Sequence, residues 1–164
     1  MGGRGSGRRS SPVSKRRVEA GLFLSIEALA EHGLLVARTD ACATVLKWLD
    51  HGNMVLASAH ATVQLDETDV GDNGDDNDTN DTTERRRIIR LRYEVEVSGT
   101  VFAVYQDLTL RAETIANGGH RWWFACPSCV GRRGTLYLPP NEKYFACRRC
   151  HRLTYNSQAR TRTG

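Results

Sequence analysis

The sequence predicts a mainly β protein with a short N-terminal helix, a small antiparallel sheet and a C-terminal ribbon built on four cysteines. Two observations carry this prediction. Apolar and polar residues alternate over residues 55–65 and 89–97, which is the pattern of a strand with one buried face. Two Cys-x-x-Cys pairs near the C-terminus have seventeen residues between them, which is the spacing of a four-cysteine metal site.

Composition divides the chain of 164 residues into four parts. Residues 1–17 are rich in Gly, Ser and Arg and predict a flexible basic arm. Residues 18–115 predict a β-rich domain with an acidic loop at 66–84. Residues 116–158 predict the ribbon, and residues 159–164 predict a basic tail.

A short helix is expected near the start of the β-rich domain. Ser25 is a favourable N-cap for a helical pattern over residues 26–32, and Glu27 suits the positive end of that helix. Gly33 suits the left-handed position that ends a helix. No second amphipathic helix follows with the turn of a helix-turn-helix motif, so that motif has little support.

The middle of the chain predicts antiparallel strands. The alternating segment 55–65 follows a turn signal and a further short apolar strand. Ser98 and Gly99 suit a tight hairpin turn between the strand at 89–97 and a returning strand at 101–110. Alternation of this kind indicates a sheet that has one face in water.

Charge is strongly segregated along the chain. The formal net charge is +4, but residues 66–84 hold nine acidic and no basic residues. A flexible loop between two strands is the expected structure there. Calcium binding is the alternative, although the spacing of a helix-flanked calcium loop is missing, and the loop could also screen the basic regions. From Arg121 onward the chain has nine basic residues and one acidic residue, Glu142, so the ribbon is predicted to be basic.

Four cysteines are predicted to hold one structural zinc ion. Each Cys-x-x-Cys pair can close a turn that aims two sulfurs at one point, and two such turns complete a tetrahedron. Four thiolates leave no open coordination position, so a catalytic metal is not expected. The predicted ligands are Cys126, Cys129, Cys147 and Cys150.

The remaining histidine and cysteine candidates have simpler interpretations. His151, next to Cys150, is the alternative fourth ligand, and Cys42 is interpreted as a small buried side chain rather than a reactive thiol. No signal-peptide core follows the basic N-terminus, and no apolar run has the length of a membrane helix. A cytoplasmic, reducing setting is therefore expected, in which paired cysteines hold metal rather than form disulfides.

Three C-terminal stretches resemble a known family. They are Gly-Gly-His-Arg-Trp-Trp-Phe-Ala-Cys-Pro-Ser-Cys at 118–129, Leu-Tyr-Leu-Pro-Pro at 136–140, and Phe-Ala-Cys-Arg-Arg-Cys-His-Arg-Leu-Thr-Tyr-Asn-Ser-Gln at 145–158. They resemble uncharacterised bacterial proteins that end in a zinc ribbon and often open with Gly-Gly-Arg-Gly-Ser-Gly-Arg, as residues 2–8 do here. The resemblance implies zinc binding and a bacterial cytoplasmic setting, but no activity. The family commonly places Gly directly after the second cysteine, where this chain has Val130.

The composition of the ribbon favours nucleic-acid binding. Arginines cluster around the metal turns, and aromatic residues interleave with them. Arginine contacts phosphate, and exposed aromatic rings stack on bases. DNA or RNA is therefore the expected partner, with no membrane and no small-molecule substrate. The residues expected to contact nucleic acid are Arg132, Arg133, Arg148, Arg149 and Arg152.

Two other functions stay open. The first is a protein-docking adaptor with a zinc ribbon and no nucleic-acid role, because ribbons often bury their aromatic residues and solvate their arginines. The second is an enzyme, which the sequence favours least because it has no nucleophile–base arrangement and no metalloprotease motif. A nuclease would need clustered carboxylates, and substitution of Asp107 or Glu113 would test for one.

Overall fold

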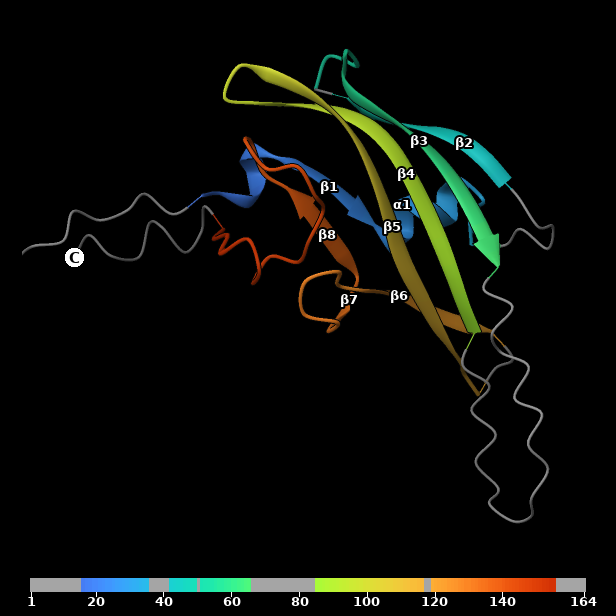
Figure 1. Ribbon diagram of the computed structural model, residues 1–164. Coiled ribbons are helices and arrows are strands. Elements are labelled where there is room, and N and C mark those ends of the chain that lie inside the picture. Colours follow the sequence, from blue (N-terminus) through green and yellow to red (C-terminus); the bar gives the residue numbers. More distant parts are fainter. Residues whose placement is uncertain (1–15, 36–41, 50, 66–84, 117–118, 156–164) are drawn as a thin grey trace, which may run out of the picture.

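The structure is a computed structural model that describes residues 16–35, 42–49, 51–65, 85–116 and 119–155 (Figure 1). Its antiparallel sheets confirm the mainly β class. The elements in chain order are a 3-10 turn Val18–Ala20, β1 Leu22–Ser25, α1 Ile26–Glu31, β2 Cys42–Leu49, β3 Val55–Leu65, β4 Arg85–Val97, β5 Thr100–Thr114, β6 His120–Ala125, β7 Arg132–Arg133 and β8 Thr135–Leu138.

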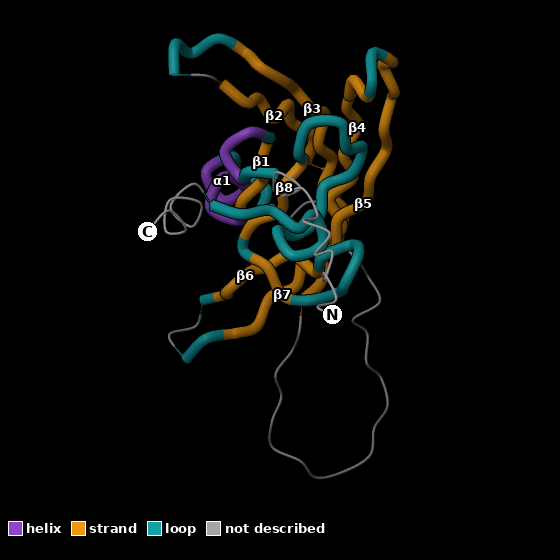
Figure 2. Tube along the Cα trace, turned by 90° about the vertical axis from the view of Figure 1, so that its left-hand side faces the viewer, coloured by secondary structure: helices purple, strands orange, loops and turns teal. Residues whose placement is uncertain are grey.

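Two sheets make up the molecule. The main sheet has six strands in the order β2-β3-β4-β5-β6-β7, and the small sheet pairs β1 with β8. Figure 1 shows the small sheet lying behind the long, curved strands of the main sheet. The view in Figure 2, turned by 90°, shows α1 beside β1 on the same side of the main sheet. The two cysteine-containing segments, called the metal turns below, are residues 126–131 between β6 and β7 and residues 147–152 after β8.

The β4–β5 hairpin has the turn that its sequence predicts. Val97 pairs with Thr100, so only Ser98 and Gly99 lie between the strands. Both residues have positive φ, 51° and 81°, which is the conformation of the two-residue turns that match strand twist. The Ser98 N–H also donates to Asn141 Oδ1 at 3.1 Å, so the hairpin tip contacts the loop after β8.

One hydrophobic core joins the main sheet to the metal turns. Ile89 and Leu91 of β4 are buried, whereas Arg90 and Arg92 are exposed, as the alternating pattern predicts. The same core continues into the C-terminal segments, so the buried cysteines are packed with the sheet. Its members from those segments are Phe124, Cys126, Leu136, Leu138, Phe145, Ala146 and Cys147.

The helix α1 is capped at both ends by the residues that the sequence predicts, Ser25 and Gly33. Ser25 Oγ accepts a hydrogen bond from the Ala28 N–H at 3.2 Å. At the other end Gly33 has a φ of 71°. Its N–H donates to the Ala30 carbonyl at 2.9 Å, and the next N–H donates to the Leu29 carbonyl at 3.0 Å, which is a Schellman ending.

The strand pairing also contains features that the sequence did not predict. No strand was expected at residues 22–25, yet β1 pairs with β8 along its whole length. In addition β5 extends to Thr114 and pairs with β6, so the main sheet continues across position 116. Pairing of this kind depends on contacts between distant segments, which local periodicity does not report.

Several sequence predictions fall outside the described part of the chain. They concern residues 1–15 of the arm predicted at 1–17, the acidic loop at 66–84, the tail at 159–164 and the side chain of Cys42. The last two residues of the predicted arm are described, and there Arg17 forms a bridge with Thr154. Within the described part, no helix is long and apolar enough to cross a membrane.

Candidate metal centre

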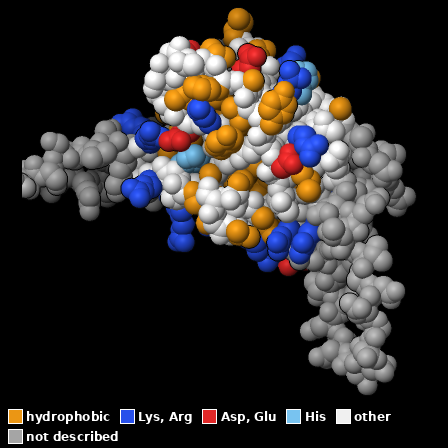
Figure 3. Space-filling view, viewed as in Figure 1, with side chains coloured by type: hydrophobic (Ala, Val, Ile, Leu, Met, Phe, Trp, Pro, Cys, Tyr) orange, Lys and Arg blue, Asp and Glu red, His pale blue; other side chains and the backbone are white. Residues whose placement is uncertain are grey.

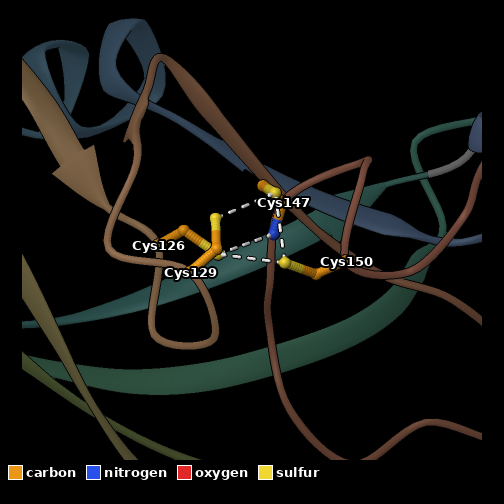
Figure 4. A group of neighbouring side chains, drawn as sticks. All are labelled: Cys126, Cys129, Cys147 and Cys150. Carbon is orange, nitrogen blue, oxygen red and sulfur yellow. Dashed lines mark hydrogen bonds between the residues drawn. The ribbon is translucent and has the colours of Figure 1, made fainter.

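Two turns bring the four predicted cysteine ligands together (Figure 4). Cys126 and Cys129 lie in the turn that follows β6. Cys147 and Cys150 lie in a turn that begins beside β8, where Tyr137 and Ala146 form an isolated bridge. The four sulfur atoms lie within 4.8 Å of one another. The residues that the spacing predicted as ligands therefore form one group.

The distances between the sulfur atoms fit a tetrahedral metal site. Cys129 Sγ lies 3.8 Å from Cys147 Sγ, Cys126 Sγ lies 3.9 Å from Cys150 Sγ, and Cys147 Sγ lies 3.5 Å from Cys150 Sγ. Four sulfurs bound at about 2.3 Å to one zinc ion would be about 3.8 Å apart. A disulfide would need about 2.05 Å. The geometry therefore suits a shared ion and excludes a disulfide between these pairs.

Backbone N–H groups shape both turns. The Val130 N–H donates to the Cys126 carbonyl at 2.8 Å, and the His151 N–H donates to the Cys147 carbonyl at 3.1 Å. Each turn is thus closed by the residue that follows its second cysteine. The Cys147 N–H also donates to Cys126 Sγ at 3.3 Å. Such a donor stabilises a thiolate and orients it toward the ion.

The four thiols differ in acidity. Burial alone would raise the pKa of Cys147, but hydrogen bonds from Arg133 and from neighbouring groups lower that pKa to about 6. Burial and hydrogen bonding to the other three thiols raise the pKa of Cys150 to about 12. Without a cation the group therefore does not ionise fully near neutral pH. A bound divalent ion would remove this obstacle, because metal binding displaces thiol protons.

Arg133 lies directly against the cysteine group. Its Nη2 lies 3.9 Å from Cys129 Sγ, and its Nη1 donates to the Arg132 carbonyl at 2.6 Å. A Cβ on Gly131 would lie only 3.0 Å from the Arg133 guanidinium, so glycine permits this close approach. Hydrogen bonding to thiol sulfur raises the pKa of Arg133. Arg133 therefore balances thiolate charge in addition to any contact with a ligand.

The other predicted nucleic-acid residues lie around the two turns. Arg132 pairs with Glu113 at 2.9 Å, and its guanidinium lies 3.5 Å from the centre of the Trp123 ring. The Arg148 guanidinium lies 4.9 Å from the centre of the Tyr155 ring. Figure 3 shows Lys and Arg side chains along the left and lower margins of the described surface. The remaining two, Arg149 and Arg152, are exposed on the second metal turn.

The alternative ligand and the two acids have other surroundings. His151 is not in the metal-ligating group found among the described residues, and its Nε2 has no hydrogen-bond partner there. Asp107 accepts two hydrogen bonds from Arg90, at 3.0 and 3.1 Å. Since Glu113 pairs with Arg132, both carboxylates are engaged with arginines.

A groove beside β7 brings together residues that the sequence did not group. It has a volume of about 1020 Å³ and extends from α1 to β6 and β7. The two adjacent tryptophans of β6 were the one feature of the sequence that could have indicated this groove. Outside β6, its lining residues come from four separate segments. We call it the β6 groove, and its charged and aromatic lining includes Arg87, Glu113, Arg121, Trp122, Trp123 and Arg132.

The fold and the site define a β-sheet protein whose four clustered cysteines can hold a metal ion. No protein-family model, curated protein or solved structure matches the chain. The resemblance to bacterial zinc-ribbon proteins thus stays a prediction.

Proposed function

We propose that the four cysteines bind one structural zinc ion and that the basic surface around the two metal turns binds nucleic acid. Soft thiolate ligands in a tetrahedral arrangement select zinc or iron–sulfur chemistry, and one isolated four-sulfur site suits a single zinc ion. Four protein ligands leave no position for a substrate, so the ion has a structural role.

The observation that carries the nucleic-acid proposal is the placement of arginines on the metal turns. Arg149 and Arg152 are exposed on the second turn, and Arg132 lies in β7 just after the first. A bound ion would fix both turns, and with them the positions of these charges. Arginine held in this way can contact phosphate at a lower entropic cost than arginine on a mobile arm.

Binding of labelled oligonucleotides tests this proposal. The zinc-loaded protein should bind single- or double-stranded oligonucleotides in a fluorescence anisotropy titration, with affinity that falls steeply as salt increases. Elemental analysis of the same sample should give one zinc ion per chain and no iron. Chelation should abolish the binding, because the turns lose their common anchor.

Charge-matched variants separate a local surface from diffuse electrostatics. Arg149→Gln with Arg152→Gln should weaken binding and lower the log–log salt slope by about two. Arg90→Gln with Arg92→Gln removes the same charge from exposed positions on the main sheet and should have a smaller effect. The basic arm provides a third comparison, because Arg4→Gln with Arg8→Gln should reduce the binding affinity less than the metal-turn pair does. Equal losses from all three pairs would contradict a defined surface.

An adaptor role is the second candidate, and exposed apolar side chains favour it. They gather at the end of the β2–β3 hairpin, where each is at least half exposed, and they are Leu49, Met54, Val55 and Leu56. Surface residues of this kind often mark a protein contact. If the zinc-loaded protein binds no oligonucleotide even at low salt, this function replaces the nucleic-acid proposal.

A further inference from the structure

The β6 groove contains more positive than negative charge. Four arginines line it, and two of them, Arg121 and Arg132, are exposed, while its acidic residues are Glu27 and Glu113. Arg87 is only 7% exposed, and its Nη1 donates to the Leu34 carbonyl at 3.3 Å. A guanidinium stays protonated in proteins, so Arg87 gives the floor of the groove a positive charge.

Aromatic rings lie next to these charges. Trp122 packs partly on the core, and the Arg87 guanidinium lies 5.0 Å from the centre of its ring. Trp123 follows on the opposite face of β6, with the Arg132 guanidinium 3.5 Å from its ring centre. His120 meets Trp122 edge to face, and its Nδ1 is buried without a hydrogen-bond partner among the described residues. The groove thus offers flat rings, cations and an unused polar atom.

We propose that the β6 groove binds an unpaired nucleotide of a single-stranded nucleic acid. The base stacks on Trp123, and Arg121, on the same face of β6, contacts phosphate together with Arg132. This inference rests on the proposed function and names the ligand and the place where the ligand binds. A duplex fits less well, because its bases are stacked inside and cannot enter a recess. A volume of about 1020 Å³ has room for about one to two nucleotides, by comparison with pockets for drug-sized ligands.

The metal centre forms one wall of this site. Arg133 lines the groove and also contacts Cys129 Sγ at 3.9 Å. Its hydrogen bond to the Arg132 carbonyl joins the two residues of β7. A metal ion that fixes the first turn would therefore also fix the arginine that stacks on Trp123. Metal binding and nucleotide binding are coupled through β7.

Binding by groove variants of the full zinc-loaded chain tests the inference. The probes are fluorescein-labelled oligothymidylate and oligouridylate, a labelled duplex and a free nucleoside monophosphate. Trp123→Leu should weaken single-strand binding about five- to a hundredfold, which is the usual effect of losing one base–aromatic stack. Arg121→Gln should lower the salt slope by about one. Arg92→Gln, at an exposed position on the main sheet, is the matched control and should change affinity less than twofold.

A crosslinking experiment locates the nucleotide independently of affinity. An oligonucleotide that contains 4-thiouridine should crosslink under ultraviolet light to the peptide that contains residues 119–123. Zinc content and near-ultraviolet circular dichroism verify that each variant folds. If Trp123→Leu does not fold, Arg121→Gln and the position of the crosslink decide the result.

The outcomes separate this inference from the proposed function. The groove would be ruled out as the binding site if its variants bind normally while Arg149→Gln with Arg152→Gln binds weakly. The proposal that the metal-turn surface binds nucleic acid would then stand. Absence of binding by the unsubstituted protein would overturn both. A monophosphate that binds as tightly as the oligonucleotides would make the ligand a free nucleotide and overturn the single-strand assignment.

Discussion

Val130 takes a backbone conformation that its branched side chain disfavours. Its φ is 58°, in the left-handed region, and its side chain is 68% exposed. A residue with a β-branched side chain rarely adopts this region, and the cost is about 1–3 kcal/mol. The hydrogen bond from its N–H to the Cys126 carbonyl requires the turn to close here. The first metal turn therefore stores strain at the position where the resembling family commonly has glycine.

Val130→Gly should stabilise the zinc-loaded protein by about 1 kcal/mol, because glycine adopts positive φ without steric cost but loses more entropy on folding. Urea denaturation of the zinc-loaded protein measures this change. Val101→Gly is the matched control, because Val101 is similarly exposed, at 64%, but lies in β5 with ordinary φ. That control should be destabilised. Loss of stability in Val130→Gly would show that the side chain makes a contact worth more than the strain.

The metal-site residues could be predicted from the sequence because they follow a fixed spacing along the chain. The residues that surround them could not, because those contacts form only in the folded chain. The two cysteine pairs are close in sequence within each pair, so local spacing was sufficient to group them. The position of Arg133 against Cys129, in contrast, was not predicted, and its predicted contact with nucleic acid stays a prediction. Only the folded turn, with Gly131 beneath the guanidinium, places that charge beside sulfur.

At the scale of elements, one buried amide joins the main sheet to the segment that carries the second cysteine pair. Gln106 of β5 is 7% exposed. Its Oε1 accepts from the Phe145 N–H at 2.8 Å and from Tyr93 Oη–H at 2.9 Å, and its Nε2 donates to the Phe145 carbonyl at 2.8 Å. Phe145 also stacks on Trp48, with ring centres 5.9 Å apart. The Gln106 side chain thus satisfies both backbone polar groups of Phe145, which a neighbouring strand would do in a sheet.

Gln106→Leu should destabilise the protein by about 2–4 kcal/mol, because it leaves the buried N–H and carbonyl of Phe145 without partners. Zinc affinity should also fall, since the ligand Cys147 is only two residues after Phe145 in the chain. Chemical denaturation and a competitive chelator measure the two effects. Gln64→Leu, at an exposed position in β3, is the control and should change neither quantity appreciably. Similar losses in both variants would mean that Gln106 does not support the metal segment.

At the scale of the whole molecule, strands with alternating residues were predictable and the sheet order was not. The β4 and β5 pattern of apolar and polar residues gives the strands, their buried faces and the turn at Ser98 and Gly99. The pairing of β1 with β8 joins residues more than a hundred positions apart, and nothing in the local sequence records it. The β6 groove was missed for a similar reason, because its lining comes from α1, β4, β5, β6 and β7, which are far apart in the sequence.

Removal of the metal should loosen one part of the molecule before the rest. Chelation should increase hydrogen exchange most in the two metal turns and in β7, which depend on the ion for their geometry. The central pairing of β3, β4 and β5 should keep most of its protection, because each of these strands has its own buried residues. Protection near Trp48 should fall by an intermediate amount, since Phe145 packs on its ring.

Hydrogen exchange followed by mass spectrometry, with and without chelator, measures these differences along the chain. Cys147→Ser should reproduce the pattern at a lower zinc content, because serine does not replace a thiolate ligand. Because one core contains both Cys147 and the buried residues of the sheet, an alternative is that the whole chain unfolds as a unit. Uniform loss of protection on chelation would establish that alternative. Unchanged exchange in the metal turns would show that the cysteines do not need an ion to hold their positions.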